Sequence, residues 1–395
     1  MSELPDPTEP ISPSGRVHWI GTGMSTGSGL GLVTRATETL LWGRTTAKAE
    51  GCLDRLGLGG TAGTRAYTPE ALAAELAPGD VVVSMLPAAE HPTLVDLALR
   101  HRAHFACSSY VSPQIRERAD EARRRGSVLL TEIGLDPGID HLYAHELVRA
   151  ARAFTGDRPA TAEFTSYCGS NPAVPNDFRY RFSWAPRGVL TALLSPARAI
   201  DSGAVTEVAR PWEAATAQSV GGETFEVYPN RDSVPFVDTY ALPGSWDLRT
   251  FVRGTMRLDG WTKAWQPVFA ELPTASEERL TELAAELAGR YPTSAEDHDR
   301  VVMSVKLRVR TDAGESWSGE YVLDATGDSR EAATPRLVSV PLACGILDLT
   351  AGRTAPGLHQ AADDPETVAR WLEFLAGQGI EAAYHEDTEA EDADA

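Results

Sequence analysis

This chain of 395 residues has little lysine and a deficit of positive charge. Lysine occurs only at Lys48, Lys263 and Lys306, and 36 basic residues face 56 acidic ones, so the formal net charge is −20 at pH 7. A field of that sign repels nucleic acids and anionic membranes, which argues against both as partners. Binding of anionic ligands is therefore expected to fall to arginine, whose guanidinium holds a carboxylate with two hydrogen bonds.

Cysteine and long apolar runs are also scarce. Cys52, Cys107, Cys168 and Cys344 lie far apart and form no CxxC pair, which favours reduced, buried thiols over disulfides or a zinc site. No apolar run approaches the roughly 18 residues that span a bilayer. The first residues lack the basic and apolar regions of a signal peptide. We therefore expect a cytoplasmic protein without a metal centre.

The first third of the chain alternates β-rich runs with helical stretches. Expected strands are residues 17–21, 40–42, 80–86, 104–109 and 127–132, and expected helices are residues 69–76, 92–101 and 113–125. Strands that alternate with helices at this spacing imply right-handed βαβ units. The pattern predicts an α/β fold that begins with a Rossmann-type, doubly wound parallel sheet.

The pattern changes after His141, where longer strands have fewer helices between them. Expected strands are residues 160–168, 225–228, 251–258, 301–310 and 317–323. In residues 301–310 apolar and basic side chains alternate, as in a strand with one buried face. The sequence therefore predicts a second, α+β domain with a mixed or antiparallel sheet.

Length and composition indicate two or three domains and two solvated ends. Residues 1–15 contain four prolines, and the last ten residues contain six acids. A late helix, residues 365–377, has Asp364 as its expected N-cap. The predicted parts are a disordered tail 1–15, a nucleotide-binding domain 16–140, a substrate-binding and catalytic domain 141–335, a segment 336–380 that packs back near the first domain, and an acidic tail 381–395.

The first expected strand leads directly into the glycine-rich segment GTGMSTGSG. Gly21 and Gly23 fit the turn that lets backbone N–H groups approach a pyrophosphate, although Thr26 stands where the GxGxxG motif has its third glycine. An acid at the end of the second strand would bind the ribose 2′-hydroxyl of NAD. This chain has Arg44 and Thr45 there, which favours the 2′-phosphate of NADP over NAD.

Several further residues carry possible chemistry. Asp136, on a loop after a strand, is a credible proton acceptor, and Tyr110 is either a proton-transfer group or a packed tyrosine. Cys168 would be the nucleophile if the protein were an aldehyde dehydrogenase. The simpler alternative is that Cys168 is a buried thiol without a catalytic role. Arg231 and Arg257 each follow or end a strand, where they can hold an anionic substrate.

Two histidines and one further acid are assigned simpler roles. His141 and His145 lie one helical turn apart, but the order HxxxHE differs from the zinc motif HExxH and no third ligand is evident. Packing or solvation explains them without a metal. Asp140 is expected to cap a helix or turn the chain rather than to act in catalysis.

Seven segments together resemble the glutamate-forming saccharopine dehydrogenase family. They are SMLP at 84–87, SSYVSP at 108–113, EIGLDPGIDHLYA at 132–144, SYCG at 166–169, FSWAPRGVL at 182–190, YPNRDSVPF at 228–236 and RGTMR at 253–257. The resemblance covers most of residues 16–380. The chain departs from the family pattern at Pro186, where a serine is usual, and at Leu258, where an aromatic residue is usual.

The resemblance implies two sets of site residues. The cofactor contacts would be Gly21, Thr22, Gly23, Met24, Ser25, Arg44, Thr45, Leu86, Pro87, Ser108, Leu135, Asp136 and Pro137. The substrate contacts would be Ser109, Tyr110, Asp136, Arg231, Thr255, Met256 and Arg257. Asp136 and Tyr110 are the expected catalytic pair, and no metal is implied.

The activity that the resemblance implies is the NADP-dependent oxidation of saccharopine to an imine, which water hydrolyses to L-glutamate and 2-aminoadipate 6-semialdehyde, or the reverse reaction. A chain of this length is expected to carry that activity alone, and a homodimer through the second-domain sheet is expected. The alternatives are a carboxynorspermidine-type dehydrogenase, a cysteine-dependent semialdehyde dehydrogenase and a non-catalytic NADP-binding module. The two arginines disfavour the first and last alternatives.

Overall fold

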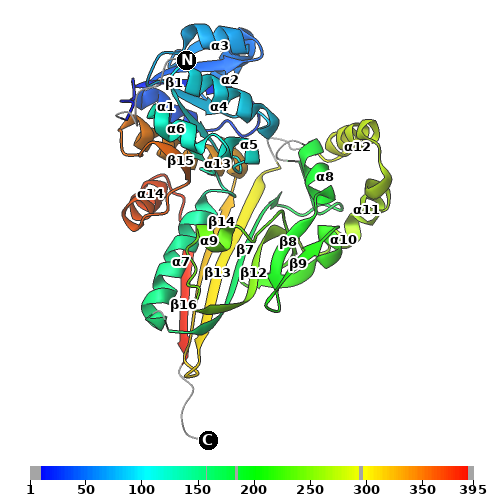
Figure 1. Cartoon of the computed structure of the whole chain (residues 1–395). Helices are drawn as coiled ribbons and strands as arrows, with labels where there is room; N and C mark the ends of the chain where they lie inside the picture. The colour runs from blue at the N-terminus through cyan, green and yellow to red at the C-terminus, as the bar shows by residue number, and fades with distance from the viewer. Residues whose placement is uncertain (1–9, 157, 183–185, 293–296, 390–395) are drawn as a thin grey trace, which may run out of the picture. The chain divides into compact units, whose positions relative to one another are not determined.

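The computed structural model describes residues 10–156, 158–182, 186–292 and 297–389. The chain divides into two compact units (Figure 1). The first unit comprises Met1–His141 and Pro335–Gly379, and the second comprises Leu142–Thr334 and Ile380–Ala395. The chain passes between the units within two helices, α7 (Ile139–Thr155) and α13 (Ala333–Thr350).

The first unit is built on a seven-stranded parallel sheet with the order β15-β6-β5-β4-β1-β2-β3. Its strands are β1 (Arg16–Ile20), β2 (Glu38–Gly43), β3 (Gly63–Ala66), β4 (Val81–Ser84), β5 (His104–Cys107), β6 (Val128–Thr131) and β15 (Gly357–Gln360). The chain leaves β1 toward β2 and later returns to its other side at β4. This reversal confirms the predicted doubly wound sheet, and sheets of this kind bind ligands at the carboxyl ends of the strands where the order reverses, here β1 and β4.

Short helices connect these strands. They are α1 (Gly29–Ala36), α2 (Thr46–Arg55), α3 (Pro69–Glu75), η1 (Ala88–Glu90), α4 (His91–Arg100), α5 (Pro113–Arg116) and α6 (Ala119–Arg125), and α14 (Pro365–Gly377) follows the last strand, β15. All four residues of β4 are buried, as expected for a strand covered on both faces. Side-chain caps begin several of the helices. Asp364, for example, accepts a hydrogen bond from the Thr367 N–H, as the sequence predicts.

The second unit is built on a nine-stranded mixed sheet, which confirms the second predicted fold class. Its strands are β7 (Ala160–Pro172), β8 (Ala197–Asp201), β9 (Ala204–Val208), β10 (Thr216–Val220), β11 (Glu223–Pro229), β12 (Trp246–Leu258), β13 (Asp299–Thr311), β14 (Ser316–Thr326) and β16 (Ala383–Glu389). The long central strands β7 and β12 pair in parallel, and β13 pairs antiparallel with β7 and with β14.

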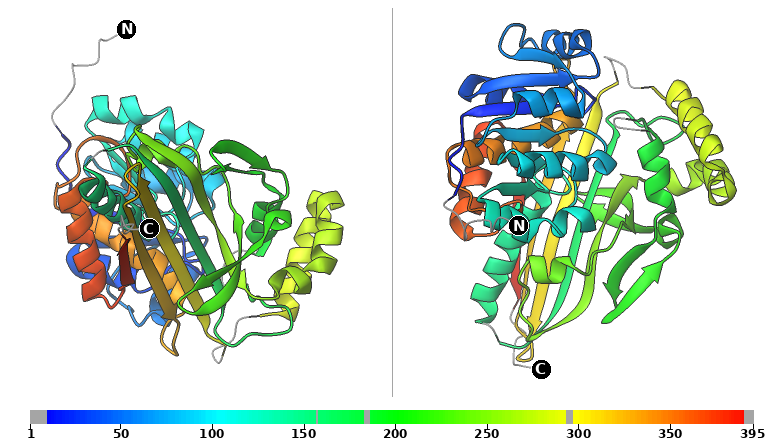
Figure 2. Two further views of the ribbon diagram at one scale, coloured as in Figure 1. Left: turned by 90° about the horizontal axis from the view of Figure 1, so that it is seen from below. Right: turned by 45° about the horizontal axis from the view of Figure 1, so that its top comes forward.

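One face of this sheet is covered by aromatic packing. The ring of Tyr143 on α7 stacks on Tyr321 of β14 at 4.6 Å, and Tyr240, after α9 (Phe236–Thr239), packs against Phe164 and Phe251. A separate aromatic core joins η2 (Pro211–Ala214), α8 (Pro186–Leu194), α10 (Trp261–Ala264), α11 (Gln266–Glu271), η3 (Leu272–Thr274) and α12 (Glu277–Arg290). In Figure 2 the yellow helix α12 lies beside the green helix α8.

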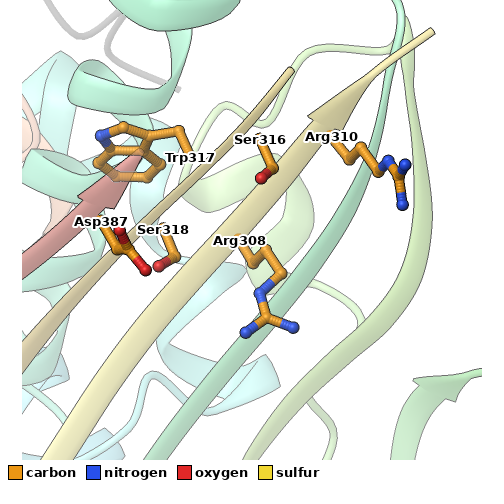
Figure 3. A pocket seen from close by; sticks show the side chains of 6 residues that line it. All are labelled: Arg308, Arg310, Ser316, Trp317, Ser318 and Asp387. Atoms are coloured by element: carbon orange, nitrogen blue, oxygen red, sulfur yellow. The ribbon is translucent and has the colours of Figure 1, made fainter. Parts of the chain in front are cut away.

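The opposite face of the sheet is polar toward one end. Arg308 and Arg310 of β13 are exposed there, beside Ser316 and Ser318 of β14, and line a pocket of about 230 Å³ (Figure 3). Arg308 lies 4.0 Å from Glu163 of the neighbouring strand β7. Charges of both signs therefore alternate across this face.

Both predicted solvated tails need correction. Ile11 is buried, its N–H donates to the Gly126 carbonyl, and the Ser14 hydroxyl donates to Asp80, so this segment is fixed to the first unit. Residues 1–9 and 390–395 lie outside the described residues. The acidic stretch 383–389 forms β16, because pairing with β14 satisfies its backbone.

Other elements were missed or merged in the sequence prediction. The prediction missed α1, α2, β3, α13 and β15, missed β8, β9, β10 and the helices α8 to α12 in the second unit, and merged α5 and α6. The described helices include none that is both long and apolar enough to cross a bilayer.

Candidate active site

The loop after β1 contains two glycines with different roles. Gly21 has φ +124°, and a Cβ on it would lie 2.9 Å from Met85, so the turn requires glycine. A Cβ on Gly23 would meet nothing within 4 Å, which leaves its backbone open to a ligand. Met24 is 51% exposed, which is unusual for a large apolar side chain. The loop thus offers accessible backbone at the carboxyl end of β1.

The glycine that packs most closely is Gly29, which the sequence analysis did not single out. A Cβ there would overlap the Ser339 carbonyl, and the Gly29 N–H donates to the Ser339 hydroxyl at 3.0 Å. In the GxGxxG motif the third glycine allows the helix to pack closely against its neighbours. Here α1 begins at Gly29, beyond the position of Thr26, whose hydroxyl instead donates to the Gly21 carbonyl. A longer loop therefore explains the incomplete motif.

Arg44 lies immediately after β2, at the carboxyl-terminal end of the strands, where the β1 loop also lies. Its side chain is exposed and has no hydrogen-bond or ion-pair partner within the described part of the chain. The Thr45 hydroxyl caps α2 by accepting the Lys48 N–H, which fixes the backbone next to Arg44. The guanidinium is thus available to a phosphate.

Leu86 and Pro87 follow β4, and Ser108, Ser109 and Tyr110 follow β5. They lie at the same carboxyl-terminal end of the strands as the β1 loop, since these strands are parallel neighbours. The predicted cofactor segments that follow β1, β2, β4 and β5 therefore all lie at this end of the sheet.

A buried histidine connects β4 to the segment after β5. His91 Nδ1 lies 2.9 Å from the Ser84 hydroxyl, and Nε2 lies 3.0 Å from the Ser109 hydroxyl. Burial lowers the pKa of His91 to about 4, so the ring is neutral at pH 7 and has one donor and one acceptor nitrogen. The sequence analysis missed His91. Its only signal was a histidine at the start of a helix that follows a strand.

The predicted catalytic pair meets within the first unit. The Tyr110 hydroxyl donates to Asp136 Oδ1 at 2.8 Å. Two glycines shape the Asp136 loop: Gly138 has φ +147°, and the Gly134 N–H donates to the Pro137 carbonyl. The Asp140 carboxylate accepts the Gly138 N–H at 2.7 Å, which supports the turn-forming role that we prefer for it.

Glu132, at the start of this loop, is a second residue that the sequence analysis missed. It is fully buried at φ +59°, and its carboxylate accepts the Val111 N–H at 2.8 Å and the Gln360 amide at 3.0 Å. The other carboxylate oxygen lies 2.9 Å from His141 Nε2. This buried network fixes both segments that carry Tyr110 and Asp136.

In the second unit, Arg257 occupies an unusual environment. It is 7% exposed, and its guanidinium carbon lies 5.0 Å from the Tyr180 ring, 5.8 Å from Tyr228 and 5.7 Å from Trp261. One nitrogen donates to the Met256 carbonyl, but its Nε has no hydrogen-bond partner and no carboxylate pairs with it in the described part of the chain. A buried cation without a carboxylate partner is suited to bind an anion from outside.

Arg231 differs from Arg257 because it is exposed and lies on a turn, at φ +60°. The Asn230 N–H donates to the Arg253 carbonyl, which fixes this turn against β12. Arg257 pairs with Glu226 within the β11–β12 ladder, whereas Arg231 lies on the turn beyond the end of β11 at Pro229, so the two arginines lie at different points along this pair of strands. Two widely separated anionic groups suit this spacing.

The remaining predicted residues of the second unit lie around Arg257. Thr255 and Met256 precede it on β12, with Thr255 on its face and Met256 buried on the other. Cys168 pairs with Thr255 in the parallel ladder, is buried, and forms no disulfide with any described residue. His145 packs edge-on against Tyr240 at 5.5 Å. No group of three metal-ligand side chains occurs among the described residues.

Two family models match most of the chain. Residues 17–130 match the family model "Saccharopine dehydrogenase NADP binding domain", and residues 134–380 match "Saccharopine dehydrogenase C-terminal domain". This chain belongs to the saccharopine dehydrogenase family. The family match confirms the resemblance inferred from the motifs and the NADP-binding nature of the first unit.

Two curated relatives are named saccharopine dehydrogenase [NADP(+), L-glutamate-forming]. The protein from Pyricularia oryzae is 34% identical over 299 residues, which cover 70% of this chain and 63% of that protein. The protein from Saccharomyces cerevisiae is 40% identical over 192 residues, 47% of this chain and 42% of that protein. The matched region of this chain thus spans less than two thirds of either relative.

Two solved structures share the fold. The apo L-Glu-forming saccharopine dehydrogenase from Saccharomyces cerevisiae has a TM-score of 0.78 at 25% identity, covering 95% of this chain and all of that one. A homospermidine synthase from Legionella pneumophila has a TM-score of 0.63 at 10% identity, covering 96% of this chain and 92% of that chain, and shows the fold alone.

Proposed function

We propose that this protein is an NADP-dependent saccharopine dehydrogenase of the L-glutamate-forming type. The substrate is saccharopine, which is oxidised to an imine that water hydrolyses to L-glutamate and 2-aminoadipate 6-semialdehyde, or is formed in the reverse direction. The observation that carries the proposal is Arg257, a buried guanidinium that lacks a carboxylate of its own. Its anion would be a substrate carboxylate.

The cofactor site uses the first unit. We assign the pyrophosphate to the loop Gly21–Ser25 and the 2′-phosphate to Arg44 with Thr45. The nicotinamide end of the cofactor site would be lined by Leu86, Pro87, Ser108 and Leu135–Pro137. Bound NADP would accept hydride from the carbon beside the substrate nitrogen. The open backbone at Gly23 and the unpartnered, exposed Arg44 support these assignments.

Proton transfer is assigned to Asp136 and Tyr110. The substrate amine must lose a proton before hydride leaves, and a water must lose one when it attacks the imine. Because the Tyr110 hydroxyl donates to Asp136, the carboxylate is oriented as an acceptor. Ser109, held by His91, is assigned to the substrate, and His91 sets its position.

Substrate carboxylates are assigned to the two arginines of the second unit. Arg257 would hold one carboxylate within its aromatic surroundings, with Thr255 and Met256 beside it. Arg231 would hold another at the solvent-exposed turn. The separation of the two arginines along the β11–β12 pair supports a long substrate with charges near both ends.

The deciding experiment measures NADP reduction by the purified protein with saccharopine, with NAD in parallel and glutamate assayed as the product. We expect NADP reduction with one glutamate per turnover, and slower reduction of NAD because Arg44 replaces the usual acid. Carboxynorspermidine is the control substrate. Turnover of carboxynorspermidine but not of saccharopine would contradict the proposal.

We also infer a cytoplasmic homodimer. Four buried cysteines that form no disulfide among the described residues support a reducing compartment. The exposed polar sheet face with Arg308 and Arg310 offers charges of both signs to a second copy (Figure 3). Light scattering on the purified protein distinguishes a monomer from a dimer.

A further inference from the structure

Arg257 has a potential internal partner that the fold keeps from it. Glu226 on β11 is directly opposite Arg257 in the antiparallel ladder, so both side chains leave the same face of the sheet. A glutamate and an arginine at opposite positions normally form an ion pair. Here neither Glu226 oxygen lies within ion-pair distance of Arg257, although both residues are described in full.

The Glu226 carboxylate is instead occupied by the segment that follows β12. One oxygen accepts the Gly260 N–H at 3.1 Å, and the other accepts the Thr262 N–H at 2.6 Å and the Thr262 hydroxyl. These donors belong to the start of α10, whose first residue, Trp261, packs against the Arg257 guanidinium. One carboxylate thus anchors the element that contributes a wall of the Arg257 environment.

We propose that Thr262 is a positioning residue for substrate binding: by holding Glu226, it keeps Arg257 unpaired and available to a substrate carboxylate. The inference rests on the proposed function for the identity of the substrate. The anion-binding role of Arg257 does not depend on turnover. Without the Thr262 hydroxyl, Glu226 loses one of three donors and becomes an internal competitor for Arg257.

The test uses Thr262→Val, which removes the hydroxyl, keeps the N–H and nearly preserves the side-chain shape. We expect the KM for saccharopine to rise about tenfold, with kcat and the KM for NADP changed by less than twofold. Thr262→Ser should restore the wild-type KM. The matched control is Thr281→Val, which removes a similar hydroxyl from the exposed face of α12.

A double variant separates this role from a purely structural one. In Thr262→Val/Glu226→Gln the competing charge is absent, so the KM for saccharopine should return toward the wild-type value. If Thr262 served only to stabilise α10, loss of the second partner would add to the defect. A KM that stays high or rises further in the double variant overturns the inference.

Calorimetric titration with glutarate, without cofactor, gives a readout independent of catalysis. Wild type and Thr262→Ser should bind this dicarboxylate equally. Thr262→Val should bind it about tenfold more weakly, and the double variant should recover. This pattern would support the inference even if saccharopine were not turned over, which would instead refute the proposed function. Equal glutarate affinity in all four proteins, or no binding to any, overturns the inference.

Discussion

At the residue scale, Arg257 is the side chain whose environment most needs an explanation. A buried guanidinium without a carboxylate costs several kcal/mol of desolvation, and three aromatic faces return only about 2 kcal/mol. An ion pair with Glu226, on the opposite strand, would stabilise the guanidinium, but Glu226 instead binds Gly260 and Thr262. This position is therefore unfavourable for folding, and in the proposed role a bound substrate carboxylate would stabilise it.

Replacement of Arg257 tests that account. Arg257→Lys keeps the charge but loses the planar fork, so we expect the KM for saccharopine to rise tenfold to a hundredfold, from about 1.5–3 kcal/mol of lost charged hydrogen bonding. Steady-state kinetics measure this rise. Arg249→Lys is the control, since Arg249 lies on the same strand but forms an exposed ion pair with Asp247. Equal kinetics for the two variants would exclude Arg257 from the substrate site.

The Asp136 and Tyr110 pair gives a second residue-scale prediction. Asp136→Asn keeps the shape but cannot accept a proton, so kcat with saccharopine should fall about 10²- to 10⁴-fold. Tyr110→Phe removes the hydroxyl that orients this carboxylate and should lower kcat by less. Stopped-flow measurement of NADP reduction resolves both effects. Near wild-type turnover in both variants would rule out this pair as the proton-transfer site.

At the element scale, the start of α1 depends on one glycine. Gly29→Ala would place a methyl group on the Ser339 carbonyl, so we expect α1 to shift, NADP to bind more weakly and the melting temperature to fall. Gly51→Ala is a matched control for which the expected change in stability has the opposite sign. Gly51 lies within α2 with open space around it, so alanine should stabilise the helix by roughly 0.5–1 kcal/mol. Thermal melts with and without NADP measure both, and a neutral Gly29→Ala would contradict the packing argument.

The elements that sequence reasoning missed share a physical cause. The α1 sequence GLGLVTRA has two glycines, and α13 contains Pro341 and Gly345, so local propensity argues against helix in both. Tertiary packing decides instead. β16 is an acidic stretch that becomes a strand because β14 offers a free edge, and the Trp317 indole donates to Glu386 across that edge. Neither contact leaves a local pattern in the sequence.

At the scale of the whole molecule, the sequence was sufficient to predict the two kinds of sheet. Alternating strands and helices predicted the parallel sheet, and the VVMSVKLRVR pattern predicted β13 of the mixed one. Motifs identified Tyr110 and Asp136, but their hydrogen bond depends on how two loops meet. The opposition of Glu226 and Arg257 depends on the register of β11 and β12, which no single segment encodes.

The stability of the first unit should depend on pH through its buried histidines. Burial lowers the pKa of both His91 and His104 from 6.5 to about 4. The unfolded chain binds a proton at each near pH 6.5, whereas the folded chain resists protonation until about pH 4. This contribution to stability is therefore fully present above pH 6.5 and is lost as the pH falls toward 4.

A variant at His104 isolates one of these contributions. Between pH 7 and pH 5 each histidine should cost the folded state about 2 kcal/mol. His104 Nδ1 accepts the Val128 N–H at 3.0 Å, and the amide oxygen of asparagine can replace that acceptor without titrating. His104→Asn should therefore lose less stability than wild type between these pH values, by about 2 kcal/mol in urea unfolding. An unchanged pH dependence would show that His104 is already protonated in the fold or remains neutral in both states.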